Sequence, residues 1–371
     1  MPFLADPVTS PNTAWLESLT PWPEHFGLER MRALLSELGE PQRRFRSVHV
    51  VGTNGKTTTT KWIEALLVAE GLHAGATISP HVSGWAERIT VDAREADLER
   101  ALGRVRPAAE RLGATQFEAL TSAAFAEFAT SVVDVAVVEA GLGGRYDATN
   151  VLASEVVVLT NVALEHTQWL GSTRDAIARE KLAVVAPGAT VVLGEPEWEP
   201  LAREFGAGEV VVADRDELAR AAVESLLGRS IGSATTRPIV PGRLEWRGER
   251  ELRDGAHNPA GVAWLVERLP AGRWVVVCSI LADKDIESML DGLAAVGPTL
   301  VTTSSSNPRA LAASELAVRA EGRFDEVVTE DDPVRALQRA HAFAASDGYV
   351  LVTGSLYLLA DLAAREEAER R

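Results

Sequence analysis

The residue types best suited to chemistry stand in one short stretch, Gly52–Thr57. An apolar run, residues 48–51, precedes it, and apolar residues at helical spacing follow it. Its two glycines permit a tight turn that brings backbone N–H groups close to an anion, and the next helix adds partial positive charge. Lys56 would reach the outer phosphates of a nucleotide, and the hydroxyl of Thr57 or Thr58 would reach a magnesium ion. An ordinary turn with a helix start is the alternative, which the strand before and the helix after disfavour.

Two other residues, Glu139 and His166, are candidates because of where they stand. Glu139 closes a nearly continuous apolar run, where packing alone does not call for a carboxylate, and its oxygens suit magnesium. His166 also follows a predicted strand end, although a lone histidine is more often structural. Lys181, judged from its own surroundings in the sequence, is predicted to be a helix lysine facing solvent.

The elements that must position these residues alternate between strands and helices. This alternation predicts a doubly wound parallel sheet followed by a smaller α/β domain, with ligands at the carboxyl ends of the strands. We expect a loose leader over residues 1–10 and a linker over residues 228–240, which divide the chain into domains 1–235 and 236–371. The main predicted strands of the first domain are 48–51, 74–78, 132–139, 155–160, 191–193 and 210–212, and its main helices are 27–38, 117–128, 172–185 and 214–227.

Composition limits the class of protein. The 371 residues carry 37 Lys and Arg against 53 Asp and Glu, a net charge of −16, which argues against a nucleic-acid or membrane-surface binder. An anionic substrate would therefore need a local positive site. The single cysteine, Cys278, excludes an intramolecular disulfide, and no apolar run approaches the length of a membrane span. A cytoplasmic monomer is expected.

A series of motifs in order resembles the folylpolyglutamate synthase/dihydrofolate synthase family of the Mur ligase superfamily, from about Trp15 to Leu362. The motifs are Gly52–Lys56, Ser79–His81 with Glu87–Ile89, Phe117–Glu118, Glu139–Arg145 with Asp147–Asn150, Leu164–Thr167 with Trp169–Gly171, Arg179–Lys181, Pro241–Arg243, Asp254–Pro259, Asp283–Asp285 and Gly354–Leu356. The resemblance implies a phosphate-loop central domain and a Rossmann-like C-terminal domain that close over ATP.

The resemblance also implies an activity: an ATP-dependent amide ligase that adds L-glutamate to dihydropteroate, to reduced folate or to both through an acyl phosphate. The implied ATP contacts are Thr53, Asn54, Gly55, Lys56 and Thr57, with Arg243, Asp254 and His257 in the second domain. The implied magnesium ligands are Ser79 and Glu139 for one ion and His166 for a second. The implied contacts of the pterin-bearing acid are Phe117, Glu118, Tyr146, Asp147 and Ala148. Lys56, His166 and Lys181 would be catalytic, and Lys181 matches the family's carbamylated lysine, which replaces the prediction that it faces solvent.

Some features depart from the family pattern. The loop reads Lys56-Thr57-Thr58 where the family usually has Lys-Gly-Ser or Lys-Gly-Thr, and the segment Pro23–Phe26 is unlike the usual pterin-side segment. The family's nucleotide-side Asn has no counterpart, since no Asn occurs between Thr167 and Asn258. Three alternatives therefore stay open: a ligase for a non-folate acid, a binding protein that has lost turnover, and a generic phosphate-loop kinase.

Overall fold

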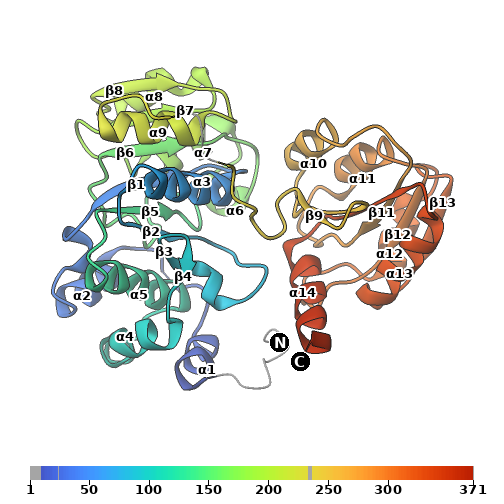
Figure 1. Ribbon diagram of the computed structural model, residues 1–371, viewed down its shortest axis with the longest axis horizontal. Helices are drawn as coiled ribbons and strands as arrows, with labels where there is room; N and C mark the ends of the chain where they lie inside the picture. The colour runs from blue at the N-terminus through green and yellow to red at the C-terminus, as the bar shows by residue number, and fades with distance from the viewer. Residues whose placement is uncertain (1–9, 24, 233–235, 371) are drawn as a thin grey trace. The chain divides into compact units, whose positions relative to one another are not determined.

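The computed structural model describes residues 10–23, 25–232 and 236–370, which form two compact units (Figure 1). The first unit contains the described residues up to Pro238, except Val82–Gly84, which group with the second unit from Ile239 onward. The predicted leader falls almost entirely on residues outside the described ranges. The predicted boundary between domains adjoins another such segment, residues 233–235.

One eight-stranded sheet forms the centre of the first unit. Its strands are β1 Arg46–Val51, β2 Ala74–Thr77, β3 Ile89–Val91, β4 Arg94–Glu95, β5 Val135–Glu139, β6 Val156–Leu159, β7 Thr190–Leu193 and β8 Glu209–Val212. The strand order is β4-β3-β2-β5-β1-β6-β7-β8, and every pair is parallel except β2–β3 and β3–β4. All five residues of β5 are buried, as a parallel strand covered on both faces requires.

Helices cover both faces of this sheet. They are α1 Pro11–Ser18, α2 Glu29–Glu37, α3 Lys56–Ala69, α4 Leu98–Leu112, α5 Gln116–Thr130, α6 Thr167–Leu170, α7 Arg174–Leu182, α8 Glu199–Glu204 and α9 Leu218–Leu227, with 3-10 turns at Pro41–Arg43, Trp85–Arg88 and Pro196–Trp198. Val48 and Val50 of β1 pack in one core with α3 and α9, while Ala136 and Val138 of β5 pack in another with α4 and α5. The unit is therefore doubly wound, as predicted.

The second unit is a smaller α/β fold built on one sheet. Its strands are β9 Glu245–Arg247, β10 Glu251–Arg253, β11 Trp274–Cys278, β12 Thr299–Thr302, β13 Glu326–Thr329 and β14 Tyr349–Thr353, in the order β13-β12-β11-β14-β10-β9. Its helices are α10 Pro259–Val266, α11 Ile286–Ala294, α12 Ala313–Ala320, α13 Pro333–Ala344 and α14 Leu356–Arg370. The first three helices contribute to one core and the last two to the other, so both faces are covered here as well. The predicted fold class is confirmed.

Several elements were not predicted from the sequence. The largest is α4, whose N-cap Asp97 accepts a hydrogen bond from the Arg100 backbone and whose C-cap Gly113 is left-handed. Helix α12, strand β13 and the antiparallel strands β3 and β4 were also missed, whereas β9 was predicted as a strand over residues 243–246. The predicted helix 214–227 begins only at Leu218. No helix in the described part of the chain is long and apolar enough to span a membrane.

Candidate active site

The loop between β1 and α3 takes its shape from the end of the neighbouring strand β6. The Asn54 backbone donates to the side chain of Asn161 at 2.8 Å, and the Thr53 backbone donates to the carbonyl of Asn161 at 2.9 Å. Thr160 completes the frame by donating from its hydroxyl to the Asn54 carbonyl at 2.8 Å. Gly52 is required here, because a Cβ atom would lie 1.9 Å from the Thr160 hydroxyl oxygen and φ is +147°.

Lys56 opens α3 and lies over this loop. Its ammonium donates to the carbonyls of Gly52 at 3.1 Å and Thr53 at 3.3 Å. Gly55, the N-cap of α3, has a left-handed φ of +85°. The loop therefore joins a fixed cation to the N-terminus of a 14-residue helix, an arrangement suited to binding phosphate.

A carboxylate and a hydroxyl meet beside the loop. Glu139, at the end of β5, accepts from the Thr57 hydroxyl at 3.0 Å and from the Ser79 backbone N–H at 3.0 Å. It is 3% exposed. The described residues include no group of three His, Cys, Asp or Glu side chains that could hold a metal ion. The set nevertheless fits magnesium, which is often bound through one carboxylate, a hydroxyl and substrate phosphates rather than by an all-protein cage. Of the two threonines considered from the sequence, Thr57 is the one that contacts Glu139.

Lys181 does not face solvent, so the prediction made from its own surroundings in the sequence was wrong. It is 1% exposed, and its ammonium donates to the Gly52 carbonyl at 2.8 Å and to Glu165 at 2.8 Å. The reason is the packing of α7, which buries the face that carries Ile177, Lys181 and Leu182. Burial lowers the pKa of Lys181, and the charge of Lys56 lowers it further, against the opposing effect of Glu165.

His166 lies at the start of α6 with a left-handed φ of +46°, next to Glu165. Burial raises the pKa of Glu165, but Lys181, Lys56 and His166 together outweigh it and hold that pKa at about 2. The carboxylate is therefore ionised at neutral pH. Glu165 thus contacts Lys181 directly and feels the charges of Lys56 and His166, although the sequence did not single it out for a role of its own.

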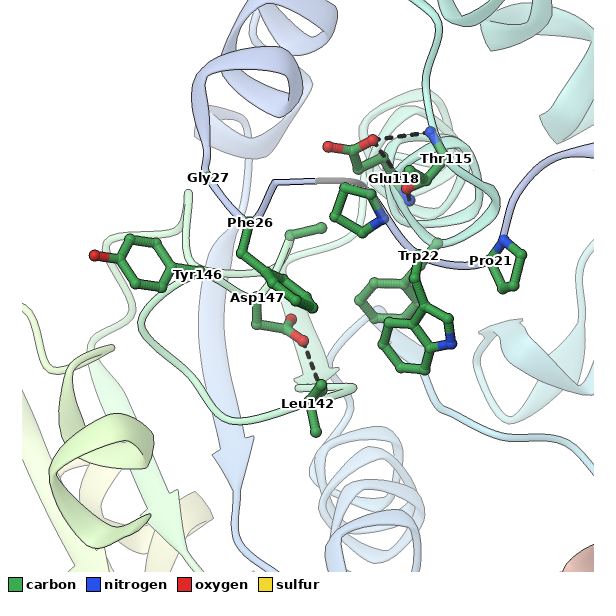
Figure 2. A pocket seen from close by; sticks show the side chains of 12 residues that line it. Pro21, Trp22, Phe26, Gly27, Thr115, Glu118, Leu142, Tyr146 and Asp147 are labelled. Atoms are coloured by element: carbon green, nitrogen blue, oxygen red, sulfur yellow. Dashed lines mark hydrogen bonds between the residues drawn. The ribbon is translucent and has the colours of Figure 1, made fainter. Parts of the chain in front are cut away.

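The five predicted acid-binding residues line one pocket (Figure 2). They come from α5 and from the loop after β5. The remaining lining residues are Pro21, Trp22, Pro23, Phe26, Gly27, Thr115 and Leu142. Pro23 and Phe26, the two ends of the segment that departs from the family pattern, therefore line this pocket. Phe26 also makes an edge-on contact with Trp169 at 5.4 Å between ring centroids.

The carboxylates of the pocket are held by the protein itself. Asp147 accepts from the backbone N–H of Leu142 at 2.8 Å (Figure 2) and from that of Thr149 at 3.0 Å. Burial raises the pKa of Asp147. The Thr149 hydroxyl in turn contacts His49 at 2.8 Å, and burial lowers the pKa of that histidine to about 4. Neutral His49 thus supports the turn that presents Asp147, a role with no signal in the sequence.

Glu118 is held by a capping box. Its side chain accepts from the Thr115 backbone N–H at 2.9 Å, the Thr115 hydroxyl at 2.9 Å and Arg30 at 2.7 Å. The Thr-x-x-Glu spacing is visible in the sequence as the start of a helix. Glu118 therefore lines the pocket but also fixes the first turn of α5.

Arg243, Asp254 and His257 gather in the second unit. Asp254 accepts from the Leu244 backbone at 2.8 Å and from the Ala256 backbone at 2.9 Å, which joins the loops before β9 and after β10. Arg243 donates to the Gly242 carbonyl at 3.0 Å, and the His257 ring contacts the Gly255 carbonyl at 2.8 Å. The predicted nucleotide contacts of the second domain thus form one cluster at the carboxyl end of β10.

Known proteins resemble this chain over nearly its whole length. The Mur ligase middle domain matches residues 50–194, and the Mur ligase glutamate ligase domain matches residues 242–356. A dihydrofolate synthase/folylpolyglutamate synthase of Mycobacterium tuberculosis is 31% identical, with 84% of this chain and 82% of that protein covered.

Two solved structures are similar as well. FolC of Escherichia coli, in complex with DHPP and ADP, matches with a TM-score of 0.89 at 28% identity over 98% of this chain and 99% of the other. A bifunctional folylpolyglutamate synthase/dihydrofolate synthase with Mn, AMPPNP and L-glutamate bound has a TM-score of 0.85 at 29% identity, covering 97% and 98%.

Proposed function

The chain belongs to the dihydrofolate synthase/folylpolyglutamate synthase family of the Mur ligases, and we propose that its own phosphate loop and aromatic pocket join L-glutamate to a pterin-bearing acid. It is an ATP-dependent ligase. The observation that carries the substrate assignment is that Phe117, Glu118, Tyr146, Asp147 and Ala148 all line one pocket. Aromatic walls of this kind bind flat heterocycles by stacking.

The reaction needs a phosphate from ATP on the acid's carboxylate, followed by displacement of that phosphate by the amine of glutamate. Lys56, which donates to two loop carbonyls, would offset the charge of the transferring phosphoryl group. Thr57 and Glu139 would hold magnesium, which neutralises phosphate charge when bound. The second-unit cluster around Asp254 would contact the nucleotide.

We further propose that Lys181 works as a carbamate. Its burial lowers the pKa, which increases the share of neutral amine that reacts with carbon dioxide. The carbamate keeps an N–H that can still donate to the Gly52 carbonyl, but its negative charge would be repelled by Glu165, so the new carboxylate would have to point away from that residue. The carbamate then offers two oxygens to the magnesium site, where an ammonium would be repelled.

The test is release of ADP and phosphate with magnesium, ATP and L-glutamate, using dihydropteroate or tetrahydrofolate as the acid. We expect one ADP for each glutamate added, identified by the mass of the product, and no release when either the acid or glutamate is omitted. Absence of release with both acids would exclude the folate assignment. Release with a different carboxylic acid would then favour a ligase for a non-folate substrate.

Two further proposals concern the oligomeric state and the cellular location of the enzyme. We propose that it acts as a monomer, which light scattering at working concentration would test. We also propose a cytoplasmic location. The single cysteine, Cys278, is fully buried in β11, so no described disulfide supports the fold. Cell fractionation would test this second proposal.

A further inference from the structure

Arg215 lies against the phosphate loop, although it comes about 160 residues after Gly55 in the chain. It follows β8 in the turn before α9. A Cβ atom on Gly55 would lie 3.0 Å from one terminal nitrogen of the Arg215 guanidinium and 3.4 Å from its Nε. The guanidinium therefore packs against the backbone of the residue from which α3 starts.

The acidic neighbours of Arg215 have other cations beside them. Asp216 pairs with Arg237 at 2.9 Å, and Glu217 pairs with Arg220 at 3.4 Å. The turn therefore places a guanidinium beside the loop, and each of the two carboxylates that follow it also has another arginine within ion-pair distance. In a chain with a net charge of −16, such local placement of a cation matters for an anionic ligand.

The other two cations of the loop act at its opposite end. Lys56 and Lys181 both donate to the carbonyl of Gly52. Arg215 instead lies beside Gly55, where the unpaired N–H groups of the first turn of α3 begin. A phosphate bound at that turn would have a lysine on one side and a guanidinium on the other.

We propose that Arg215 is a nucleotide-binding residue of this enzyme, donating from its guanidinium to phosphate oxygens of ATP and ADP beside Gly55. The proposal rests on the assignment of the loop as the nucleotide site. The planar fork of arginine matches phosphate geometry. The stretch between Thr167 and Asn258, which lacks the family's nucleotide-side Asn, thus still supplies a side chain to the nucleotide.

The test is calorimetric titration of the full chain with ADP and, separately, with inorganic tripolyphosphate. Arg215→Ala should weaken both about ten- to hundredfold, the range for losing a charge-assisted hydrogen bond. Arg215→Lys should recover part of the loss. The matched control is Arg203→Ala, which removes the same charge from an exposed side chain of α8 that pairs with Glu199 at 2.8 Å. It should leave both affinities unchanged.

Three results would overturn the proposal. The first is an ADP affinity of Arg215→Ala within about twofold of wild type, in a variant whose unfolding midpoint is unchanged. The second is weaker ADP binding with unchanged tripolyphosphate binding, which would place the contact away from the phosphates. The third is an equal loss of affinity in Arg203→Ala, which would mean that the effect comes from the net charge of the protein and not from a contact of Arg215. Failure of the ligase assay with both acids would remove the folate assignment but leave these binding results valid.

Discussion

Replacing Lys181 with methionine should destabilise the protein and end turnover, for two reasons that can be separated. Methionine keeps the volume of the buried stem but leaves Glu165, whose side chain is 10% exposed, without its cation at 2.8 Å. Removing one partner of a buried ion pair typically costs about 3–5 kcal/mol. The pKa of Glu165 sets the scale of the electrostatics: a drop from 4.5 to about 2 corresponds to about 3 kcal/mol at neutral pH, to which Lys181, Lys56 and His166 all contribute.

The double variant Lys181→Met/Glu165→Gln isolates the ion pair. A neutral amide needs no cation, so it should recover most of the lost stability while turnover stays absent. The assay is urea unfolding at pH 7 in buffer freed of carbon dioxide, which keeps Lys181 of the wild type as an amine. Arg179→Met is the matched control, because it removes a cation from the exposed face of the same helix and should change the unfolding midpoint little.

The catalytic reason is tested with Lys181→Ala, which opens space at the site. A short carboxylate such as acetate should restore part of the turnover by standing in for the carbamate, and Lys181→Arg should remain inactive. The ion-pair reasoning is refuted if Lys181→Met unfolds at the same urea concentration as wild type. The carbamate reasoning is refuted if Lys181→Arg turns over like wild type or if acetate has no effect.

Three other predictions follow from the site. Lys56→Ala should abolish turnover with only a small change in the unfolding midpoint, since its ammonium donates to two loop carbonyls; near-normal turnover would remove the loop from the mechanism. Glu139→Gln and His166→Ala should each raise the magnesium concentration for half-maximal turnover, and unchanged titrations in both would count against metal ligation. Burial lowers the pKa of His49 from 6.5 to about 4, so the unfolded state binds a proton at a higher pH than the folded state does. The free energy of unfolding of the wild type should therefore fall by about 3 kcal/mol as the pH is lowered from 6.5 to 4, and His49→Asn should lack this contribution in urea unfolding.

Local patterns in the sequence were enough to predict the frame of the site. Apolar runs such as Val135–Glu139 become buried parallel strands because a sheet covered by helices on both faces needs them apolar throughout. Helix α4 was also predictable, since Asp97 caps its start and Gly113 its end. Missing it was a failure to use signals that were present.

The surroundings of individual side chains were harder to predict. Lys181 is adjacent in sequence to Glu180 and two positions from Arg179, and both of those side chains are more accessible than its own. Only the packing of α7 decides which face is buried, and that packing depends on residues far away in the chain. Pocket lining by Trp22 and Phe26 is equally nonlocal. Lys181 and Asp147 became candidate site residues only through the resemblance to a family, because local patterns in the sequence did not indicate them.

The phosphate loop shows the same division between local and distant causes. Its glycines allow the turn, but its hydrogen bonds come from Thr160 and Asn161, more than 100 residues later in the chain. Lys181 adds a third distant contact at the Gly52 carbonyl. The shape of the loop is thus fixed by Thr160 and Asn161, which follow the end of β6, rather than by the residues after Lys56. This explains physically why a loop that departs from the family pattern there still holds its lysine at the N-terminus of α3.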